Sequence, residues 1–477
     1  MFTYFLYHFV IIFNHFIIFY VVVMNGIFML QMFVSLFDTA MYMIKTRHYE
    51  YRLMGQSTNM IPISLLVPAY NEEMNIVESI KSFLNLDYLN YEIIVINDGS
   101  KDNTLKTVID AFGLQKVSDP VRMRLTTREV RGIYYNPELP RLRLIDKENG
   151  GKSDALNAGL NLSRYPYFVS VDADSFLKSN ALLCIAMAFI KNKHTVAVGG
   201  IVRLINGCRV EEGKLVNAGI PKKIWEKFQT LEYLRSFLVG RIGWNHFNSL
   251  LIISGALGAF QKEPVLQVNG YTTGTIGEDM DLVVKLHRYM INKKYKYKVA
   301  FLPDPICWTQ APATLKTLFR QRRRWHIGLI DVISRNRDIF FNPRYGVVGI
   351  FSIPFHFLFE EMAPIVEVLG YIMIPLAWYF GLLSTEMFVL FLIASIFFGV
   401  ITSIGSLAVE DLTTASYIRV RELLFMVFLS FVENIFYRQM TVGFRLVGIF
   451  SSRKYRQTWG IMKRQKLNQD SDEKNGR

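Results

Sequence analysis

Apolar positions fall into two long blocks that flank a region of ordinary polarity. Residues 2–44 contain no Lys, Arg or Glu and a single Asp, Asp38. At a rise of about 1.5 Å per residue, a helix of this length can cross a ~30 Å hydrocarbon core. We predict one membrane span here, with 2–13 as a candidate second, shorter segment before Asn14 and His15. A basic start and a small-residue cleavage site are not visible, so the segment is expected to be retained.

The second apolar block covers residues 344–450 and divides into the stretches 350–383, 386–408 and 423–449. The first two are predicted spans. The third contains Arg438 and Arg445, so it either crosses the membrane or lies at the interface. Three crossings would leave the basic tail outside and two would keep it inside. Because the first basic residues, from Lys45 onward, follow the N-terminal span, the positive-inside rule predicts a cytoplasmic location for the central region.

The central region alternates β-branched runs with stretches of helical periodicity. This pattern is typical of an α/β domain with a mostly parallel sheet and crossover helices. The predicted strands are 63–67, 92–96, 142–145, 167–171 and 195–202. The predicted helices are 72–86, 153–162, 181–190 and 280–290, with a further helix around 321–325. Residues 114–143 carry six arginines and resemble a basic insertion between elements of the sheet.

Polar side chains follow three of these strands, where ligands of such sheets bind. Asp172 and Asp174 are two residues apart, so at an extended strand end they point to the same side, which suits a divalent cation. Taken singly, each Asp is more typical of a turn or a helix N-cap than of a metal site. The coincidence at three strand ends favours a site made of Tyr70, Asn71 and Glu72 after the first strand, Asp98 after the second, and Asp172 and Asp174 after the fourth.

Three later segments add candidate chemistry. The stretch 150–154 brings glycines and Lys152 to a helix start, where backbone amides and one ammonium can hold a phosphate, although an ordinary strand-to-helix turn is as good a reading. Asp279 lies in the first turn of a helix, where capping is the alternative role. Gln321, Arg324 and Trp325 share one helical face, whereas Arg322 and Arg323 are expected to point elsewhere. Arg can donate two hydrogen bonds to phosphate oxygens, and the Trp ring can pack against a sugar ring. The alternative is that these residues belong to a basic helix at the membrane surface.

The order of these residues resembles one enzyme family. The motifs D, DxD, (T)ED and QxxRW of processive family 2 glycosyltransferases (cellulose, chitin, hyaluronan and poly-N-acetylglucosamine synthases) are matched by Asp98, Asp172-x-Asp174, Glu278-Asp279 and Gln321-x-x-Arg324-Trp325. The resemblance covers the central domain and extends to the flanking helices. Residues 147–157 are most similar to bacterial exopolysaccharide and poly-N-acetylglucosamine synthases. One departure is Gly277, where the family usually has Thr.

The resemblance implies how a UDP-sugar donor would be held. The uracil and ribose would contact Tyr70, Asn71, Glu72 and Asp98. The cofactor would be Mg²⁺ or Mn²⁺, bound on the diphosphate by Asp172 and Asp174. Charge on the departing UDP would be offset by this metal, Lys152 and Arg324.

It also implies an inverting transfer to a growing polysaccharide. Asp279, with Glu278 beside it, would deprotonate the acceptor hydroxyl as that oxygen attacks the anomeric carbon. The acceptor end would be lined by Gln321, Trp325, Ser254 and Gly255. The growing end of the polymer would lie beside Trp325, which precedes the second apolar block by about twenty residues in the sequence. We therefore expect synthesis to be coupled to secretion. Glu360, Glu361 and Glu367, inside that block, are candidate contacts for the passing glycan, and a buried structural network is the alternative.

We therefore predict four parts: an N-terminal transmembrane segment (1–50), a cytoplasmic Rossmann-like glycosyltransferase domain (51–335), interfacial and transmembrane helices (336–450), and a basic, polar cytoplasmic tail (451–477). The protein is expected to be a multi-pass protein of the cell membrane in contact with lipid. Its donor sugar and any accessory membrane or export subunits are not legible from the sequence.

Composition narrows the alternatives. The formal net charge is +14, with 54 Lys and Arg against 40 Asp and Glu. No nucleic-acid recognition motif accompanies this charge, and several basic residues flank apolar segments, so membrane orientation and diphosphate binding explain it better. A nonprocessive transferase acting on a lipid phosphate would share the D and DxD motifs but not QxxRW. A non-enzymatic scaffold would be expected to have lost some of the acids, and all are present.

Overall fold

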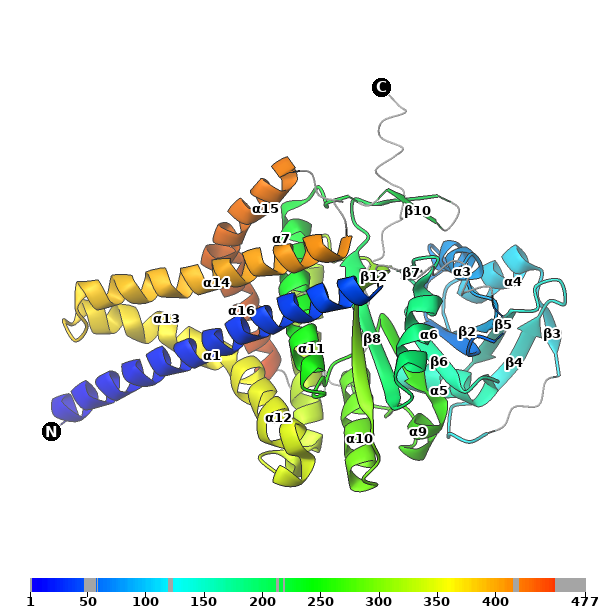
Figure 1. Cartoon of the computed structure of the whole chain (residues 1–477), viewed down its shortest axis with the longest axis horizontal. Coiled ribbons are helices and arrows are strands. Elements are labelled where there is room, and N and C mark those ends of the chain that lie inside the picture. Colours follow the sequence, from blue (N-terminus) through cyan, green and yellow to red (C-terminus); the bar gives the residue numbers. More distant parts are fainter. Residues whose placement is uncertain are drawn as a thin grey trace.

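The computed structural model describes residues 2–46, 57, 59–118, 123–211, 214–217, 219–414 and 420–450. An α/β domain lies beside a group of long apolar helices (Figure 1). The predicted tail, 451–477, and the basic residues Arg47 and Arg52 lie outside the described residues.

The α/β domain is built on one ten-stranded sheet. In spatial order its strands are β3 (Gln115–Val117), β4 (Val130–Tyr135), β5 (Leu142–Lys147), β2 (Tyr91–Asp98), β1 (Ile63–Ala69), β6 (Tyr167–Val171), β11 (Leu257–Gln261), β8 (Thr195–Leu204), β12 (Lys298–Thr309) and β7 (Phe176–Leu177). A separate small ribbon pairs β9 (Arg209–Glu211) with β10 (Lys214–Asn217). The five predicted strands are therefore confirmed.

Two expectations about this sheet were wrong. The run β5-β2-β1-β6 is parallel, but β11 is inserted antiparallel between β6 and β8, so the sheet is mixed. Residues 114–143 are not a plain insertion: they contain β3 and β4, which extend the sheet at its edge in antiparallel pairing. Both strands are partly exposed, so neither shows the continuous apolar run of a buried strand.

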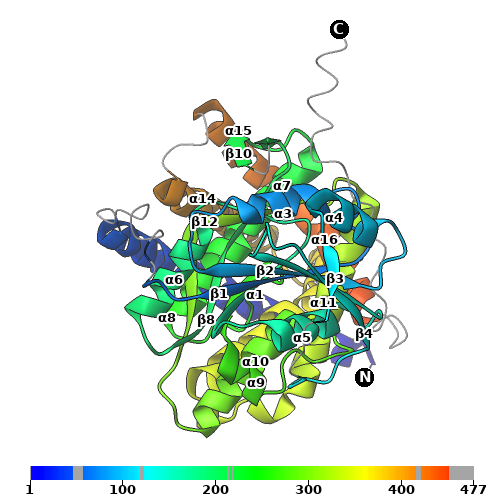
Figure 2. The same cartoon turned by 90° about the vertical axis from the view of Figure 1, so that its right-hand side faces the viewer.

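Side chains of the parallel strands alternate between two cores, as the two-residue period of a strand requires. On β1, Leu65 and Val67 pack into one core and Leu66 into the other. The first core is covered by α3 (Ile76–Leu84), α4 (Thr104–Phe112) and α6 (Ala181–Lys191). The second is covered by α5 (Lys152–Leu162), α9 (Lys262–Gln267) and α10 (Glu278–Asn292). Figure 2 shows α3 and α4 on one side of the strands and α5, α9 and α10 on the other.

A layer of helices connects the sheet with the apolar group. It consists of α7 (Ile224–Tyr233), the π-helical η1 (Leu234–Val239), α8 (Gly240–His246) and α11 (Leu315–Arg335). These helices contact β8 and β12 on one side and α1, α14, α15 and α16 on the other. After α11 the chain continues through η2 (Arg337–Ile339), η3 (Pro343–Tyr345), η4 (Val348–Ser352), α12 (Ile353–Phe355) and η5 (His356–Glu361).

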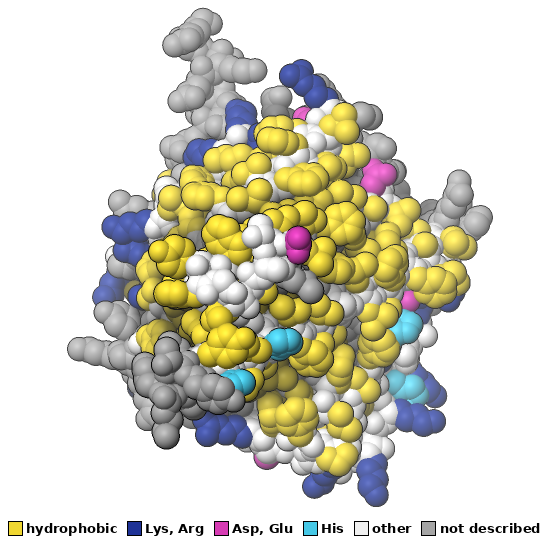
Figure 3. Space-filling view, turned by 90° about the vertical axis from the view of Figure 1, so that its left-hand side faces the viewer, with side chains coloured by type: hydrophobic (Ala, Val, Ile, Leu, Met, Phe, Trp, Pro, Cys, Tyr) yellow, Lys and Arg dark blue, Asp and Glu magenta, His cyan; other side chains and the backbone are white. Residues whose placement is uncertain are grey.

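Within the described residues, three apolar helical segments are long enough to cross a membrane: Tyr7–Thr46, Phe388–Thr413 and Arg421–Ile449. They belong to α1 (Phe2–Thr46), to α14 (Thr385–Thr414), and to the run of α15 (Val420–Val432), η6 (Glu433–Tyr437) and α16 (Arg438–Ile449). Exposed apolar side chains predominate on the side of the molecule where these helices lie, among scattered polar and charged side chains (Figure 3). The chain therefore has the helices of a membrane-associated protein.

The span predicted over 350–383 does not coincide with one continuous regular helix, and it stays a prediction. Its first part is divided among η4, α12 and η5, and only α13 (Ala363–Tyr379) is a regular helix, of 17 residues. A helix of this length lies at the lower end of the range of about 17–25 residues that can cross a ~30 Å hydrocarbon core. The stretch 423–449, which the sequence left undecided, falls within a helix that is long enough to span.

Candidate active site

A cavity of about 1190 Å³ opens between the strand ends, the connecting helices and the apolar helices. It is lined by all the predicted catalytic, donor-binding, acceptor-binding and metal-binding residues: Tyr70, Asn71, Glu72, Asp98, Lys152, Asp172, Asp174, Ser254, Gly255, Glu278, Asp279, Gln321, Arg324 and Trp325. Segments that are more than 250 residues apart in the chain thus meet around one space, because the carboxyl ends of the parallel strands share one edge of the sheet.

Asp98, at the end of β2, is buried and surrounded by donors. One carboxylate oxygen accepts from Lys147 Nζ at 2.6 Å and from the Gly150 amide at 3.0 Å. The other accepts from the Gly151 amide at 2.7 Å and from Asn149 Nδ2 at 3.2 Å. Asp98 therefore holds the 149–151 loop, which leads into α5, in place.

Lys152 is the first residue of α5, and Gly151 before it has a φ of 86°, a conformation that favours glycine. Its ammonium lies 2.5 Å from Asp172 Oδ1 and 3.6 Å from Glu278 Oε1, and it donates to the Gly255 carbonyl at 3.0 Å. A Cβ on Gly255 would lie 2.8 Å from this ammonium, so glycine leaves room for the approach. Burial lowers the pKa of Lys152, but the neighbouring carboxylates, Asp172 foremost, outweigh burial and raise it.

Asp172 and Asp174 follow β6 directly. Asp174 is buried, whereas the Asp172 side chain keeps 31% of its surface exposed and faces the cavity beside Lys152. Among the described residues, no cluster of three or more His, Cys, Asp or Glu side chains converges as a preformed metal cage. A pair of carboxylates fits Mg²⁺ or Mn²⁺ nonetheless, because such ions are commonly held by one or two carboxylates together with substrate phosphates.

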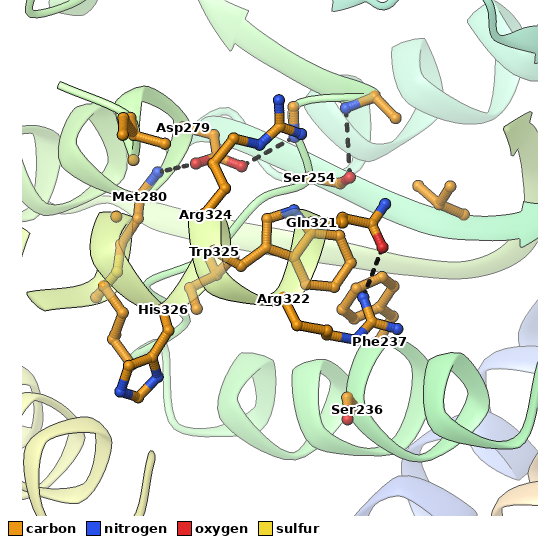
Figure 4. A pocket seen from close by; sticks show the side chains of 18 of the residues that line it. Ser236, Phe237, Ser254, Asp279, Met280, Gln321, Arg322, Arg324, Trp325 and His326 are labelled. Atoms are coloured by element: carbon orange, nitrogen blue, oxygen red, sulfur yellow. Dashed lines mark hydrogen bonds between the residues drawn. The ribbon is translucent and has the colours of Figure 1, made fainter. Parts of the chain in front are cut away.

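Glu278 and Asp279 open α10. Asp279 Oδ1 accepts from the Met280 amide at 2.8 Å and Oδ2 from the Gly255 amide at 3.0 Å (Figure 4). Burial, opposed by Lys152 and reinforced by Asp279, raises the pKa of Glu278 to about 7. The cluster thus brings three carboxylates, those of Asp172, Glu278 and Asp279, around the Lys152 ammonium.

Gly277, the departure from the family pattern, has a packing reason. Its Cα lies against the backbone of Gly328 on α11, and a Cβ there would meet the Gly328 carbonyl oxygen at 3.0 Å and Val332 Cγ2 at 2.9 Å. Glycine at both positions lets the start of α10 lie directly on α11. This close contact places Asp279 near the helix that carries Gln321 and Trp325.

Trp325 lies on α11 with 36% of its surface exposed. It belongs to an aromatic group with Tyr233 of α7 and Phe237 of η1, whose ring centroids lie 6.2 and 5.8 Å from the Trp325 ring. Gln321 and Arg324 line the cavity on the same helix (Figure 4). The site thus pairs a cluster of charges with an aromatic platform.

The expectation that Arg322 points away from this face was wrong. Arg322 is buried and lines the cavity, with its guanidinium 4.4 Å from the Trp325 ring centroid. Its Nη1 donates to Gln321 Oε1 at 2.8 Å and its Nη2 to Glu232 Oε2 at 2.6 Å. Tyr437 of η6 also donates to Glu232, at 2.8 Å. A helical wheel does not reveal such a buried charge, because its partner lies 90 residues away.

The helix run 224–246 was not recognised as part of the site, although it supplies several cavity residues, including Tyr233, Arg235, Phe237 and Arg241. A signal was present: Arg235 and Arg241 are the only charged residues in the otherwise uncharged stretch 234–244. Arg235 forms a two-pronged ion pair with Glu433 of η6, at 2.6 and 3.1 Å. The π-helical segments η1, η5 and η6 all line the cavity, as π-segments at functional sites often do.

The cavity continues among the apolar helices. Polar residues line this extension, including Asn25 and Gln31 of α1, Glu360 of η5, Glu367 of α13 and Thr402 of α14. Glu367 pairs with Arg438 at 3.3 Å and accepts from Tyr371 at 3.1 Å. Glu361, the third predicted glutamate, is buried but is not among the residues that line the cavity.

Two family models match the chain: "Glycosyl transferase family 2" over residues 64–247 and "Glycosyl transferase family group 2" over residues 167–432. The second match covers more than half of the 477 residues. The chain is a family 2 glycosyltransferase. The predicted fold class, an α/β glycosyltransferase domain flanked by apolar helices, is confirmed, as is its assignment as an enzyme.

Curated relatives of this glycosyltransferase include the poly-beta-1,6-N-acetyl-D-glucosamine synthases of Staphylococcus epidermidis and Staphylococcus aureus (strain COL), each 29% identical, over 275 and 276 residues. Each match covers 57% of this chain and 56% of the relative, so it spans little more than half of either protein. Among solved structures, a mannosyltransferase, PcManGT from Pyrobaculum calidifontis, in complex with GDP-Man and Mn²⁺, aligns with a TM-score of 0.48 at 16% identity, covering 87% of this chain and 99% of that one.

Proposed function

We propose that this glycosyltransferase polymerises a UDP-sugar into a β-linked polysaccharide. The observation that carries the proposal is one continuous cavity that joins the Lys152 charge cluster, the Asp279 carboxylate and the Trp325 platform. N-acetylglucosamine is the proposed donor sugar, in keeping with the names of the staphylococcal relatives.

The donor would occupy the strand-end side of this cavity. Tyr70, Asn71 and Glu72 would contact the nucleoside together with the 149–151 loop that Asp98 holds. Lys152 and Arg324 would face the diphosphate, where cationic groups stabilise the charge that develops on the leaving UDP. Asp172 and Asp174 would hold Mg²⁺ or Mn²⁺, which would supply further positive charge at the diphosphate oxygens.

The acceptor would enter from the aromatic side. The terminal sugar would lie on Trp325, near Gln321, Ser254 and Gly255, with one hydroxyl directed at Asp279. Asp279 takes the hydroxyl proton as the acceptor oxygen bonds to the anomeric carbon, while the bond from that carbon to UDP breaks and UDP leaves with the electron pair. Attack from the face opposite UDP converts an α-linked donor into a β-linkage. Glu278, beside Asp279, would contribute to the electrostatic environment of this base.

Repetition of this step requires an exit for the polymer. The extension of the cavity among α1, α13, α14 and α16 is lined by amides, hydroxyls and charged side chains, which can hydrogen-bond a glycan within an otherwise apolar group of helices. We propose that this extension conducts the chain across the membrane, with the sheet domain on the cytoplasmic side. The protein would then be a multi-pass membrane protein.

The test is incorporation of radiolabelled sugar by the purified full chain in detergent, with each UDP-sugar supplied alone together with Mg²⁺ or Mn²⁺. Asp279→Asn should reduce polymer formation by about 10²- to 10⁴-fold, the usual contribution of a general base. Asp281→Asn is the matched control, because Asp281 lies on the same helix but outside the cavity, where it accepts a hydrogen bond from the Thr272 hydroxyl. Retained activity in Asp279→Asn would refute the assignment of the base, and a product with a single added sugar would refute polymerisation. In sealed vesicles, labelled product that stays accessible to a glycosidase on the side of synthesis would refute conduction.

A further inference from the structure

Arg241, on α8, is a buried cation on the wall of the cavity that no predicted role includes. Its side chain is 7% exposed and its guanidinium lies 4.2 Å from the Phe237 ring centroid. Within the described part of the chain it forms no hydrogen bond or ion pair, and its Nη1 is fully buried without an acceptor. Two other arginines that line the cavity differ: the half-buried Arg235 is bound to Glu433 and the buried Arg322 to Glu232.

The surroundings of Arg241 indicate which part of the substrate it meets. Phe237, over whose ring the guanidinium lies, also contacts Trp325. The acidic groups that act on it are Asp279 and, more weakly, Glu360 on the side of the apolar helices. Burial lowers the pKa of Arg241 to about 10, with Asp279 acting in the opposite direction, so the guanidinium stays charged at neutral pH. Arg241 therefore lies near both the proposed base and the aromatic group.

A buried guanidinium without a hydrogen-bond partner costs free energy, and a ligand that brings an acceptor atom removes this cost. The cavity is wide enough for a sugar, and sugars carry oxygen acceptors around the ring. We propose that Arg241 is an acceptor-binding residue whose guanidinium donates to an oxygen of the terminal sugar of the growing polysaccharide. This proposal rests on the proposed function and adds a residue that fixes the terminal sugar beside Asp279. A different role, in which Arg241 only balances the charge of Asp279, makes a different kinetic prediction.

The experiment compares Arg241→Met and Arg241→Lys with the wild-type full chain in detergent, using UDP-N-acetylglucosamine, Mn²⁺ and a short β-linked oligosaccharide of N-acetylglucosamine as acceptor. Arg241→Met should raise the acceptor KM by about 10- to 100-fold, the usual effect of losing a hydrogen bond from a charged group, and shorten the product, while the donor KM stays within twofold. Arg241→Lys should recover part of the loss, because it keeps the charge and one donor. Arg288→Met is the matched control, since Arg288 pairs with Asp338 outside the cavity.

An unchanged acceptor KM with a lower kcat in Arg241→Met would overturn the proposal in favour of charge balance. Titration calorimetry with the oligosaccharide alone provides a second test that needs no turnover. The wild-type protein should bind it at least tenfold more tightly than Arg241→Met, with equal melting temperatures, and equal or absent binding in both would overturn the role of Arg241. A wild-type protein that binds the oligosaccharide but converts no UDP-sugar would instead refute the proposed function and leave Arg241 as a glycan-binding residue.

Discussion

Glu278 makes the stability of the protein depend on pH in a way that can be measured. It is 7% exposed, lies at the start of α10 and has Lys152 Nζ 3.6 Å away as its nearby cation. Burial raises its pKa from an ordinary value of 4.5 to about 7. Glu278→Gln removes this titration while keeping the size and one acceptor oxygen of the side chain.

The sign follows from proton linkage. A group whose pKa is raised by folding contributes stability that is fully present below pH 4.5 and is lost as the pH rises through about 7. At about 1.4 kcal/mol for each pH unit, the difference between the two pKa values corresponds to about 3 kcal/mol. Glutamine carries no charge at any pH, so Glu278→Gln should become more stable relative to the wild type by up to this amount between pH 5 and pH 8.

The assay is thermal unfolding of both proteins in detergent at pH 5, 6, 7 and 8, with a chelator and without UDP, so that no cation compensates the carboxylate. The melting temperature of the variant should rise relative to that of the wild type by a few degrees between the extremes. Glu263→Gln is the matched control, because Glu263 is exposed and contacts Arg124 and Gln267 at the surface. A difference between wild type and Glu278→Gln that is constant with pH would refute the reasoning.

Two further predictions concern buried ion pairs. Asp98→Asn replaces one of two acceptor oxygens by a donor that faces the Gly151 amide. It should therefore lower both the melting temperature and the affinity for UDP measured by calorimetry. Loss of UDP binding without any loss of stability would contradict the role of Asp98 in holding the loop. Arg235→Met leaves Glu433, which is 1% exposed, without its cation and should destabilise the protein by about 3–5 kcal/mol. Arg235→Met combined with Glu433→Leu should recover most of this loss. Equal stability of the single and double variants would refute a stabilising role for this ion pair.

The predictable part of the fold is the part set by local pattern. The five strands found from the sequence are buried β-branched or aliphatic runs, and their order along the chain implied that the polar residues after them would meet. The missed strand β11 begins at a glycine-rich stretch and is only five residues long, so its local signal is weak. Its antiparallel place between β6 and β8 is a property of long-range pairing, which no local pattern encodes.

The residues that line the cavity likewise divide into those that a local sequence pattern reveals and those that depend on long-range contacts. Carboxylates at strand ends could be found from spacing, but Arg322 and Arg241 could not, because an arginine on a helix reads as a surface residue until its burial is known. The two arginines lie on helices of the layer formed by α7, η1, α8 and α11, and this layer packs between the sheet and the apolar helices. The closest signal was the occurrence of two arginines in the otherwise uncharged stretch 234–244, and it indicates burial only once that stretch is known to lie between the sheet and the apolar helices.

The charges inside the last apolar stretch now have a physical explanation. A basic residue in a helix long enough to span suggests either an interfacial position or a polar interior, and the sequence could not choose between them. In the structure, Glu433 is paired with Arg235 of η1, and Tyr437 shares Glu232 with Arg322 of α11, so η6 is joined to the helices that carry the aromatic group. Because these polar contacts all face the cavity, the stretch can remain apolar toward lipid and still be bound through its π-helical segment to the helix that positions Trp325. A displacement of η6 would therefore be expected to move the proposed acceptor platform with it.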